Sequence, residues 1–194
     1  MSCPARFSPQ SMALVAFVLT ACGPDYKKLS EDALGKADRF VAAAQTNGGK
    51  INPTETQRLA DSLKVAKGYA TDGKYKEAYN AAVDVANASI TVSRAFGPKK
   101  TELENTYSSV SKAIAPAARM TLAKIKQLQG GRKVPPGMTA ASFDSLAKAS
   151  QGWEATWKEA VALHDSGDLA LAAQKAEKVR DDVLGAMKVL GIKQ

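Results

Sequence analysis

The sequence predicts an all-α protein, folded as an antiparallel bundle of about six helices. Apolar side chains recur at steps of three and four residues along most of the chain, which is the spacing of one helix face. No segment alternates apolar and polar residues for long enough to indicate a β-strand. Aromatic residues make up only 6% of the chain and alanine is abundant, which favours closely packed helices with small residues where they cross.

The first three-helix unit is predicted over residues 30–97. Ser30 is a suitable N-cap for its first helix, and acidic residues follow it in the first turn. Asn52-Pro53 opens the second helix, because a capping asparagine followed by proline is a strong start signal. Phe96-Gly97-Pro98 is expected to end the third. The predicted helices are 30–45, 53–70 and 75–96.

The second unit, residues 98–194, is predicted to hold three longer helices, at 99–129, 142–164 and 169–190. Pro116 lies inside the first and is expected to kink or split it, since proline removes one backbone hydrogen bond. The middle helix shows the sharpest pattern, with steps of three and four that are typical of a seam facing other helices. The seam consists of Phe143, Leu146, Ser150, Trp153, Trp157, Ala160 and His164.

The two units look duplicated. Asp61-Ser62-Leu63 matches Asp144-Ser145-Leu146 at an offset of 83 residues, and the glycine turns at Gly73 and Gly167 match at an offset of 94, so the second copy carries an insertion of 11 residues. Eleven residues are close to three helical turns, so such an insertion lengthens a helix without rotating its buried face. Chance similarity between alanine-rich helices with glycine turns is the alternative.

The helix pairs of both units resemble tetratricopeptide-like hairpins. They are more similar to a family of uncharacterised alanine-rich helical-hairpin envelope lipoproteins, through Gly73-Lys74-Tyr75 with Ala78 and through Gly167-Asp168-Leu169 with Ala172. Neither resemblance implies catalytic residues.

An apolar run at residues 12–19 leads into Leu19-Thr20-Ala21-Cys22. It is far shorter than the roughly 20 residues that a membrane-spanning helix needs, but it fits the apolar part of a signal peptide. The four residues resemble the lipobox of bacterial lipoproteins. The resemblance implies a signal peptide at 1–21, a lipidated Cys22 and a tether at 22–29. An ordinary secretory signal or a short buried helix is the alternative.

The same resemblance implies a location. Gly23 stands where an aspartate would retain such a lipoprotein at the inner membrane, so outer-membrane sorting with the body facing the periplasm is expected. Two acyl chains on one cysteine give firmer anchoring than one chain. The formal net charge of +8 suits an anionic lipid, a cell-wall polymer or an acidic protein face, although lysines that only solvate the surface would give the same value. No nucleic-acid partner is expected, since no basic run carries interleaved aromatics.

Catalytic, metal-binding and cofactor-binding residues are not expected. Cys3 would leave with the signal peptide, and one histidine without a free thiol cannot supply the usual zinc, haem or copper ligand sets. Asp165 and Ser166 follow His164 directly, and neighbours on one turn do not reach the geometry of a catalytic triad. His164 more readily caps the end of its helix.

Trp153 and Trp157 lie one turn apart on one helix face, and packing in the core is their simplest role. The other role is a partly exposed groove between the predicted helices 142–164 and 169–190 that receives a partner helix or an apolar ligand, with His164 and Tyr107 as neighbours. The sequence therefore favours a membrane-anchored, non-enzymatic interaction or assembly module with an envelope protein as partner. The alternative is a helical bundle that binds a small ligand or an envelope polymer, such as anionic lipid or cell wall.

Overall fold

The computed structural model describes residues 24–192, and these residues form six helices without a strand. The predicted all-α fold is confirmed. The helices are α1 (Tyr26–Gly48), α2 (Pro53–Thr71), α3 (Tyr75–Gly130), α4 (Ala140–Ser150), α5 (Trp153–Asp165) and α6 (Leu169–Val189).

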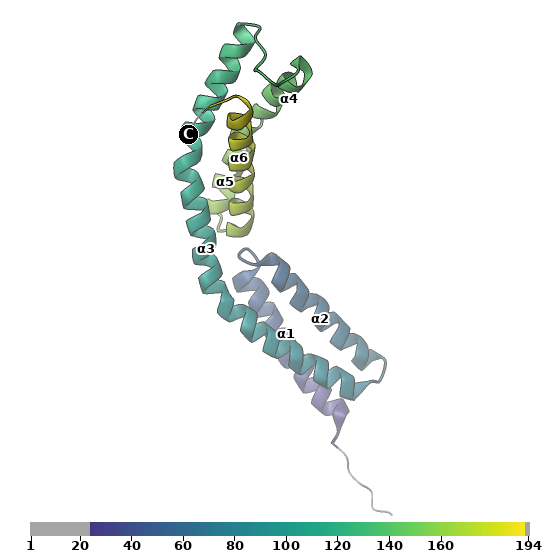
Figure 1. Cartoon of the computed structure of the whole chain (residues 1–194). Coiled ribbons are helices and arrows are strands. Elements are labelled where there is room, and N and C mark those ends of the chain that lie inside the picture. Colours follow the sequence, from purple (N-terminus) through teal and green to yellow (C-terminus); the bar gives the residue numbers. More distant parts are fainter. Residues whose placement is uncertain (1–23, 193–194) are drawn as a thin grey trace, which may run out of the picture.

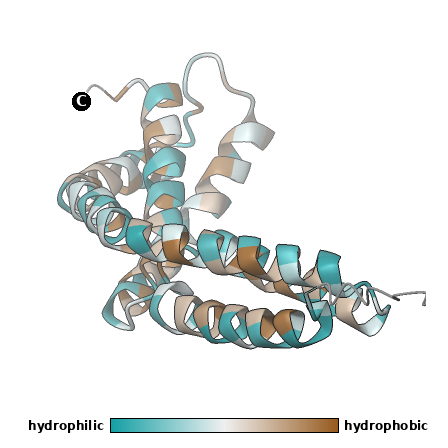
Figure 2. Cartoon of the chain, turned by 90° about the horizontal axis from the view of Figure 1, so that it is seen from below, coloured by the Kyte–Doolittle hydropathy of each residue, from teal (hydrophilic) through white to brown (hydrophobic). Residues whose placement is uncertain are grey.

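Helix α3 runs along most of the elongated molecule (Figure 1). Helices α1 and α2 pack against its first half, and α6 packs against its second half together with α5. Helix α4 lies beyond α5, near the far end of α3. Apolar and polar stretches alternate along the helices, as amphipathic packing requires (Figure 2). The result is a long helix that carries shorter helices on two successive segments.

The buried side chains form two main clusters. The first joins α1, α2 and the first half of α3, and the second joins the rest of α3 with α4, α5 and α6. Alanines without exposed surface stand in both, among them Ala37, Ala82, Ala160 and Ala176. Small side chains allow helix axes to approach closely, and the few buried aromatic rings, Phe96, Phe143 and Trp153, fill the wider spaces of the two clusters.

The predicted helix end at Phe96-Gly97-Pro98 is wrong, because α3 continues through it. Proline cannot donate a hydrogen bond, so one carbonyl of the preceding turn loses its helical partner. Phe96 is buried in the first cluster, and Leu103 is buried in a small third cluster. Burial on both sides holds the helix together across the missing bond. Pro116 likewise lies inside α3 and does not divide it.

The predicted start of the first helix at Ser30 is also wrong. Helix α1 begins at Tyr26, so residues 26–29, expected in the tether, are helical. The Asp25 side chain accepts a hydrogen bond from the Lys28 backbone at 3.3 Å, and the Tyr26 ring packs edge-on against Tyr79 at 6.3 Å. Ser30 is buried inside the helix, where its hydroxyl donates to the Lys27 carbonyl. A cap and an aromatic contact thus extend the helix by one turn.

The predicted helix at 142–164 is two helices, α4 and α5. The Gln151 and Gly152 amides donate to carbonyls three residues earlier, at 3.2 and 3.1 Å, which tightens the chain between them. The backbone of both residues stays in the right-handed helical region. The apolar seam therefore crosses the break, and Ser150 and Trp153 are buried on either side of it.

The turns at Gly73 and Gly167 have the same geometry. Both glycines have a positive φ, 75° and 76°, and in both turns the next amide donates to a carbonyl five residues earlier. Helix α3 ends in the same way at Arg132, with a φ of 52°, and α6 at Gly191. Since four helix ends share this form, the matching turns do not separate a duplication from chance similarity.

Lys50 joins the two halves through its backbone carbonyl and its side-chain ammonium. Its carbonyl accepts a hydrogen bond from the Ala170 amide in the first turn of α6 at 3.1 Å, and its ammonium donates to the Ser166 carbonyl at the end of α5 at 2.9 Å. These contacts satisfy backbone groups that helix termini leave unpaired. Ile51 packs against both the first cluster and the small cluster around Leu103 and Leu169. The loop after α1 thus fixes the second half against the first.

Substitution of Gly48 by alanine tests the close contact between α1 and α3. A methyl group there would overlap the buried ring of Phe96. We expect Gly48→Ala to lower the free energy of unfolding by about 1–3 kcal/mol, because the ring must move. Gly35→Ala, on the same helix with open space around it, should raise it by roughly 0.5–1 kcal/mol. Urea unfolding measures both, and a Gly48→Ala protein as stable as the parent would contradict this packing.

Candidate functional site

The candidate site lies between α3 and α5 in the second half of the molecule. The Tyr107 ring of α3 stacks on two rings of α5, with centroid distances of 5.9 Å to Trp157 and 4.1 Å to His164. Both pairs are nearly parallel, at 4° and 11°. Three of the four residues predicted for a binding face are therefore neighbours. Trp153, the fourth, lies one turn before Trp157 and is buried in the second cluster.

A hydrogen bond ties His164 to α3. Its Nε2 lies 2.8 Å from Glu104 Oε2, whereas its Nδ1 lies 3.6 Å from Asp165 Oδ1, which is too long for a hydrogen bond. His164 stands in the last turn of α5, where its Nε2 bonds Glu104 rather than a carbonyl of the helix end. Glu104 was not predicted, although it precedes Tyr107 by three residues and therefore shares its helix face. The Ser166 hydroxyl donates to the Leu163 carbonyl.

The phenol of Tyr107 is held in its neutral form. Burial raises its pKa above the ordinary value, and the carboxylates of Asp165 and Glu104 raise the pKa further, because a phenolate beside them would be repelled. The neutral phenol can donate a hydrogen bond across the physiological pH range. The Tyr107 hydroxyl is thus a hydrogen-bond donor that lies near the carboxylates of Glu104 and Asp165 and beside the rings of Trp157 and His164.

The two tryptophans face a groove between α3 and α5, to which α6 adds only Val179, so the predicted location between the last two helices is wrong. The groove encloses about 210 Å³, and its lining includes Ala115, Ala118, Arg119, Leu122, Trp153 and Trp157. Trp153 is only 5% exposed, so Trp157 offers the accessible aromatic surface. Pockets for drug-sized ligands usually have roughly 300–1,000 Å³. The groove therefore has room for one or two side chains of a partner, more than for a whole ligand.

A second hollow lies between α3 and α6, and Pro116 is one of the residues that line it. It has a volume of about 340 Å³ and is lined mainly by apolar groups, among them Met120 and Met187. Met120 is 50% exposed. Sequence periodicity did not reveal this hollow, because methionine and alanine on a helix face equally suit a filled core.

Within residues 24–192, no group of three histidine, cysteine, aspartate or glutamate side chains is arranged to hold a metal ion. Over the same residues, no helix combines the length and apolar character that crossing a membrane requires. The lipobox-like residues 19–22 lie outside the part of the chain that the structure describes.

Comparison with known proteins gives no match: no protein-family model fits the chain, and neither a curated protein nor a solved structure is similar to it.

Tyr107→Phe tests the electrostatics of the stack. A phenol whose pKa is higher in the folded state keeps its proton there but loses it on unfolding above about pH 10, so the parent protein loses stability as the pH rises through this range. We expect the free energy of unfolding to fall less steeply with pH in Tyr107→Phe. Urea unfolding at a series of pH values from 8 to 11 measures both slopes, and identical slopes would show that the pKa is not raised.

Proposed function

We propose that this chain is a lipid-anchored, non-enzymatic interaction module of the bacterial cell envelope, facing the periplasm from the outer membrane. The sequence Leu19-Thr20-Ala21-Cys22 supports the anchor, and Gly23 supports the outer membrane. A lipid anchor would hold the helical body at a membrane, and the grooves between its helices are surfaces to which another protein can bind.

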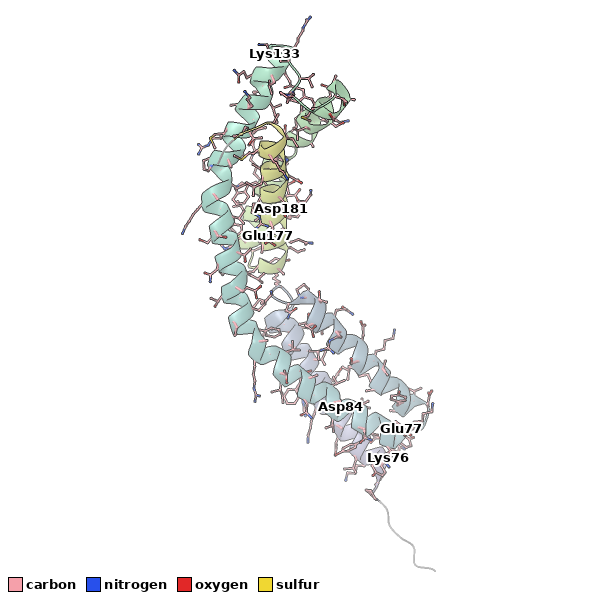
Figure 3. The ribbon with its side chains drawn as sticks, in the orientation of Figure 1. Lys76, Glu77, Asp84, Lys133, Glu177 and Asp181 are labelled. Atoms are coloured by element: carbon pink, nitrogen blue, oxygen red, sulfur yellow. The ribbon has the colours of Figure 1, made fainter. Side chains whose placement is uncertain are left out.

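The shape of the body supports the same proposal. Cys22 precedes the first helical residue, Tyr26, by four positions, a span of at most about 14 Å of extended chain. Helix α1 starts at one end of the elongated body, near the labelled Lys76, whereas Lys133 lies at the opposite end (Figure 3). A lipid on Cys22 would therefore hold the molecule by one end. The 56 residues of α3 correspond to about 84 Å of helix, so the second half can stand well away from the bilayer.

The observation that carries the interaction role is the groove beside Trp157. Its apolar walls, one aromatic face and the rim charges of Arg119 and Glu154 combine the features of a protein-binding pocket. Its volume of about 210 Å³ fits side chains of a partner. The other candidate function, binding of an anionic envelope polymer or small ligand, rests on Arg119 at the same groove and on the net charge of +8.

Crosslinking in intact cells tests the interaction role. Ala115 is exposed at the groove, and Ala115→Glu places a charge against its apolar wall. We expect the amount of envelope protein crosslinked to this variant to fall at least about tenfold. A tenfold fall corresponds to a loss of about 1.4 kcal/mol in binding free energy. Ala95→Glu changes an exposed alanine in the first half of α3 and serves as the matched control. Equal crosslinking of the two variants would exclude the groove as the interface.

Membrane fractionation tests the anchor separately. We expect Cys22→Ala to move the protein from the membrane fraction to the soluble fraction, because the acyl chains have no other attachment point in the proposal. A Cys22→Ala protein that stays with the membrane would rule out lipidation as the anchor. Quenching of tryptophan fluorescence by cell-wall fragments, without a crosslinked protein, would favour the polymer-binding function.

A further inference from the structure

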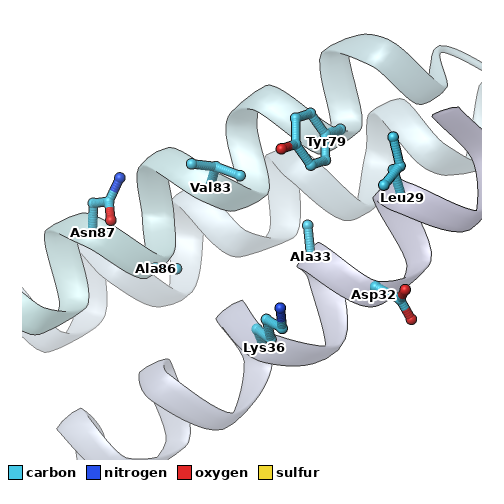
Figure 4. Close-up of a pocket in the computed structure, with 8 residues that line it drawn as sticks. All are labelled: Leu29, Asp32, Ala33, Lys36, Tyr79, Val83, Ala86 and Asn87. Carbon is cyan, nitrogen blue, oxygen red and sulfur yellow. The ribbon is translucent and has the colours of Figure 1, made fainter. Parts of the chain in front are cut away.

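A second groove lies in the first half of the molecule, between α1 and α3. It has a volume of about 260 Å³, and no residue of α2 lines it. Figure 4 shows the two helices side by side, with the lining residues drawn as sticks between and along them. The lining includes Leu29, Ala33 and Lys36 from α1 and Tyr79, Val83 and Ala86 from α3.

The two helices run in the same direction. Tyr26 contacts Tyr79 near the start of both helices, and Gly48 lies against Phe96 at the other end of α1. The lining residues of α1 and α3 therefore follow each other at the same steps of four and three along both helices. Small side chains at Ala33 and Ala86 leave the floor hollow. The groove is thus a channel that follows the line along which α1 and α3 lie side by side.

Exposed apolar side chains continue this channel beyond the pocket. Phe40 and Ile90 lie one turn further along their helices than Lys36 and Ala86, and they are 43% and 36% exposed. Leu29, at the other end, is 38% exposed. From Leu29 to Phe40 the channel spans 11 residues, about 16 Å, which matches three turns of a helix laid along it. An apolar strip of this length has the dimensions that the apolar face of an amphipathic helix would cover.

The edges of the channel are basic. Lys36 lines it, and Arg39, Lys76 and Arg94 each lie three or four residues from a lining or strip residue, which places them on the adjoining helix face. Among the described residues, none of these four side chains forms an ion pair with a carboxylate. Asp32 supplies an acidic group at the same edge, and Asp25 and Asp84 meet the same spacing, so these four basic residues stand against three acidic ones. The excess of positive charge complements a partner with acidic flanks.

We propose that the groove between α1 and α3 is the docking site for an acidic amphipathic helix of a partner protein. The helix would place apolar side chains at steps of four, three and four in the channel, with glutamate or aspartate on both sides. A flat anionic lipid surface has the charge but not the shape, because it cannot fill the hollow floor at Ala33 and Ala86. The proposal concerns the folded body and does not depend on lipidation or on the groove beside Trp157.

The test uses a fluorescent synthetic peptide with leucine at these steps and glutamate at the flanking positions, titrated with the full-length protein. We expect saturable binding by anisotropy, and we expect no binding of a peptide with the same composition in scrambled order. Ala86→Arg should weaken binding by at least about tenfold, because the side chain fills the channel. Val65→Arg, at a position on α2 that is 57% exposed, is the matched control and should bind as the parent does.

A charge exchange separates this docking from simple apolar contact. We expect the double variant Lys36→Glu, Arg39→Glu to lose the acidic peptide and to gain a peptide with lysine at the flanking positions. Equal binding of the ordered and scrambled peptides, or no effect of Ala86→Arg, would overturn the proposal. The proposal would also be overturned if vesicles containing anionic phospholipid bound the parent protein but not the Ala86→Arg variant. That result would assign the groove to a lipid surface.

Discussion

The continuity of α3 is the constraint on which the rest of the structure depends. This one helix contributes buried side chains to each of the two main hydrophobic clusters, so the other helices are positioned by packing against it. Two prolines lie inside α3, and burial on both sides of Pro98 offsets the hydrogen bond that proline removes. The contacts of Lys50 with the start of α6 and the end of α5 then set the second half against the first. A single rod and one polar bridge thus fix the arrangement of both halves.

Much of this fold could be predicted from the sequence, because helix periodicity and glycine turns are local properties. The turns at Gly73 and Gly167 and the start at Pro53 follow from their own residues. Two of the missed boundaries depend at least in part on contacts that are distant in sequence, whereas the break between α4 and α5 is made by local hydrogen bonds. Gly97-Pro98 ends helices in most contexts, and only the packing of Phe96 and Leu103 carries α3 through it. The early start of α1 depends on Tyr79, more than fifty residues away.

The candidate site shows the same division. Trp153, Trp157 and His164 share a face of one helical seam, and that could be inferred from spacing alone. The arrangement of Tyr107 between Trp157 and His164 required the register of α3 against α5, which no local pattern gives. Glu104 was missed for the same reason, since a surface glutamate on a helix carries no sign of its partner. The grooves depend on what neighbouring helices leave uncovered, which is a property of packing rather than of any single helix.

The clusters follow one another along the chain, and this order bears on biosynthesis. The buried residues of the first cluster lie between Ala33 and Phe96, so that half has all of its core before the second cluster has been synthesised. Domains generally fold as units during synthesis, starting from the N-terminus. The second half of α3 then emerges with Val110, Ile114 and Ile125 uncovered, and these wait for α5 and α6. A chain interrupted after Gly130 would have a folded first half followed by a helix segment with exposed apolar side chains. Quality-control proteases and chaperones recognise exposed apolar segments of this form.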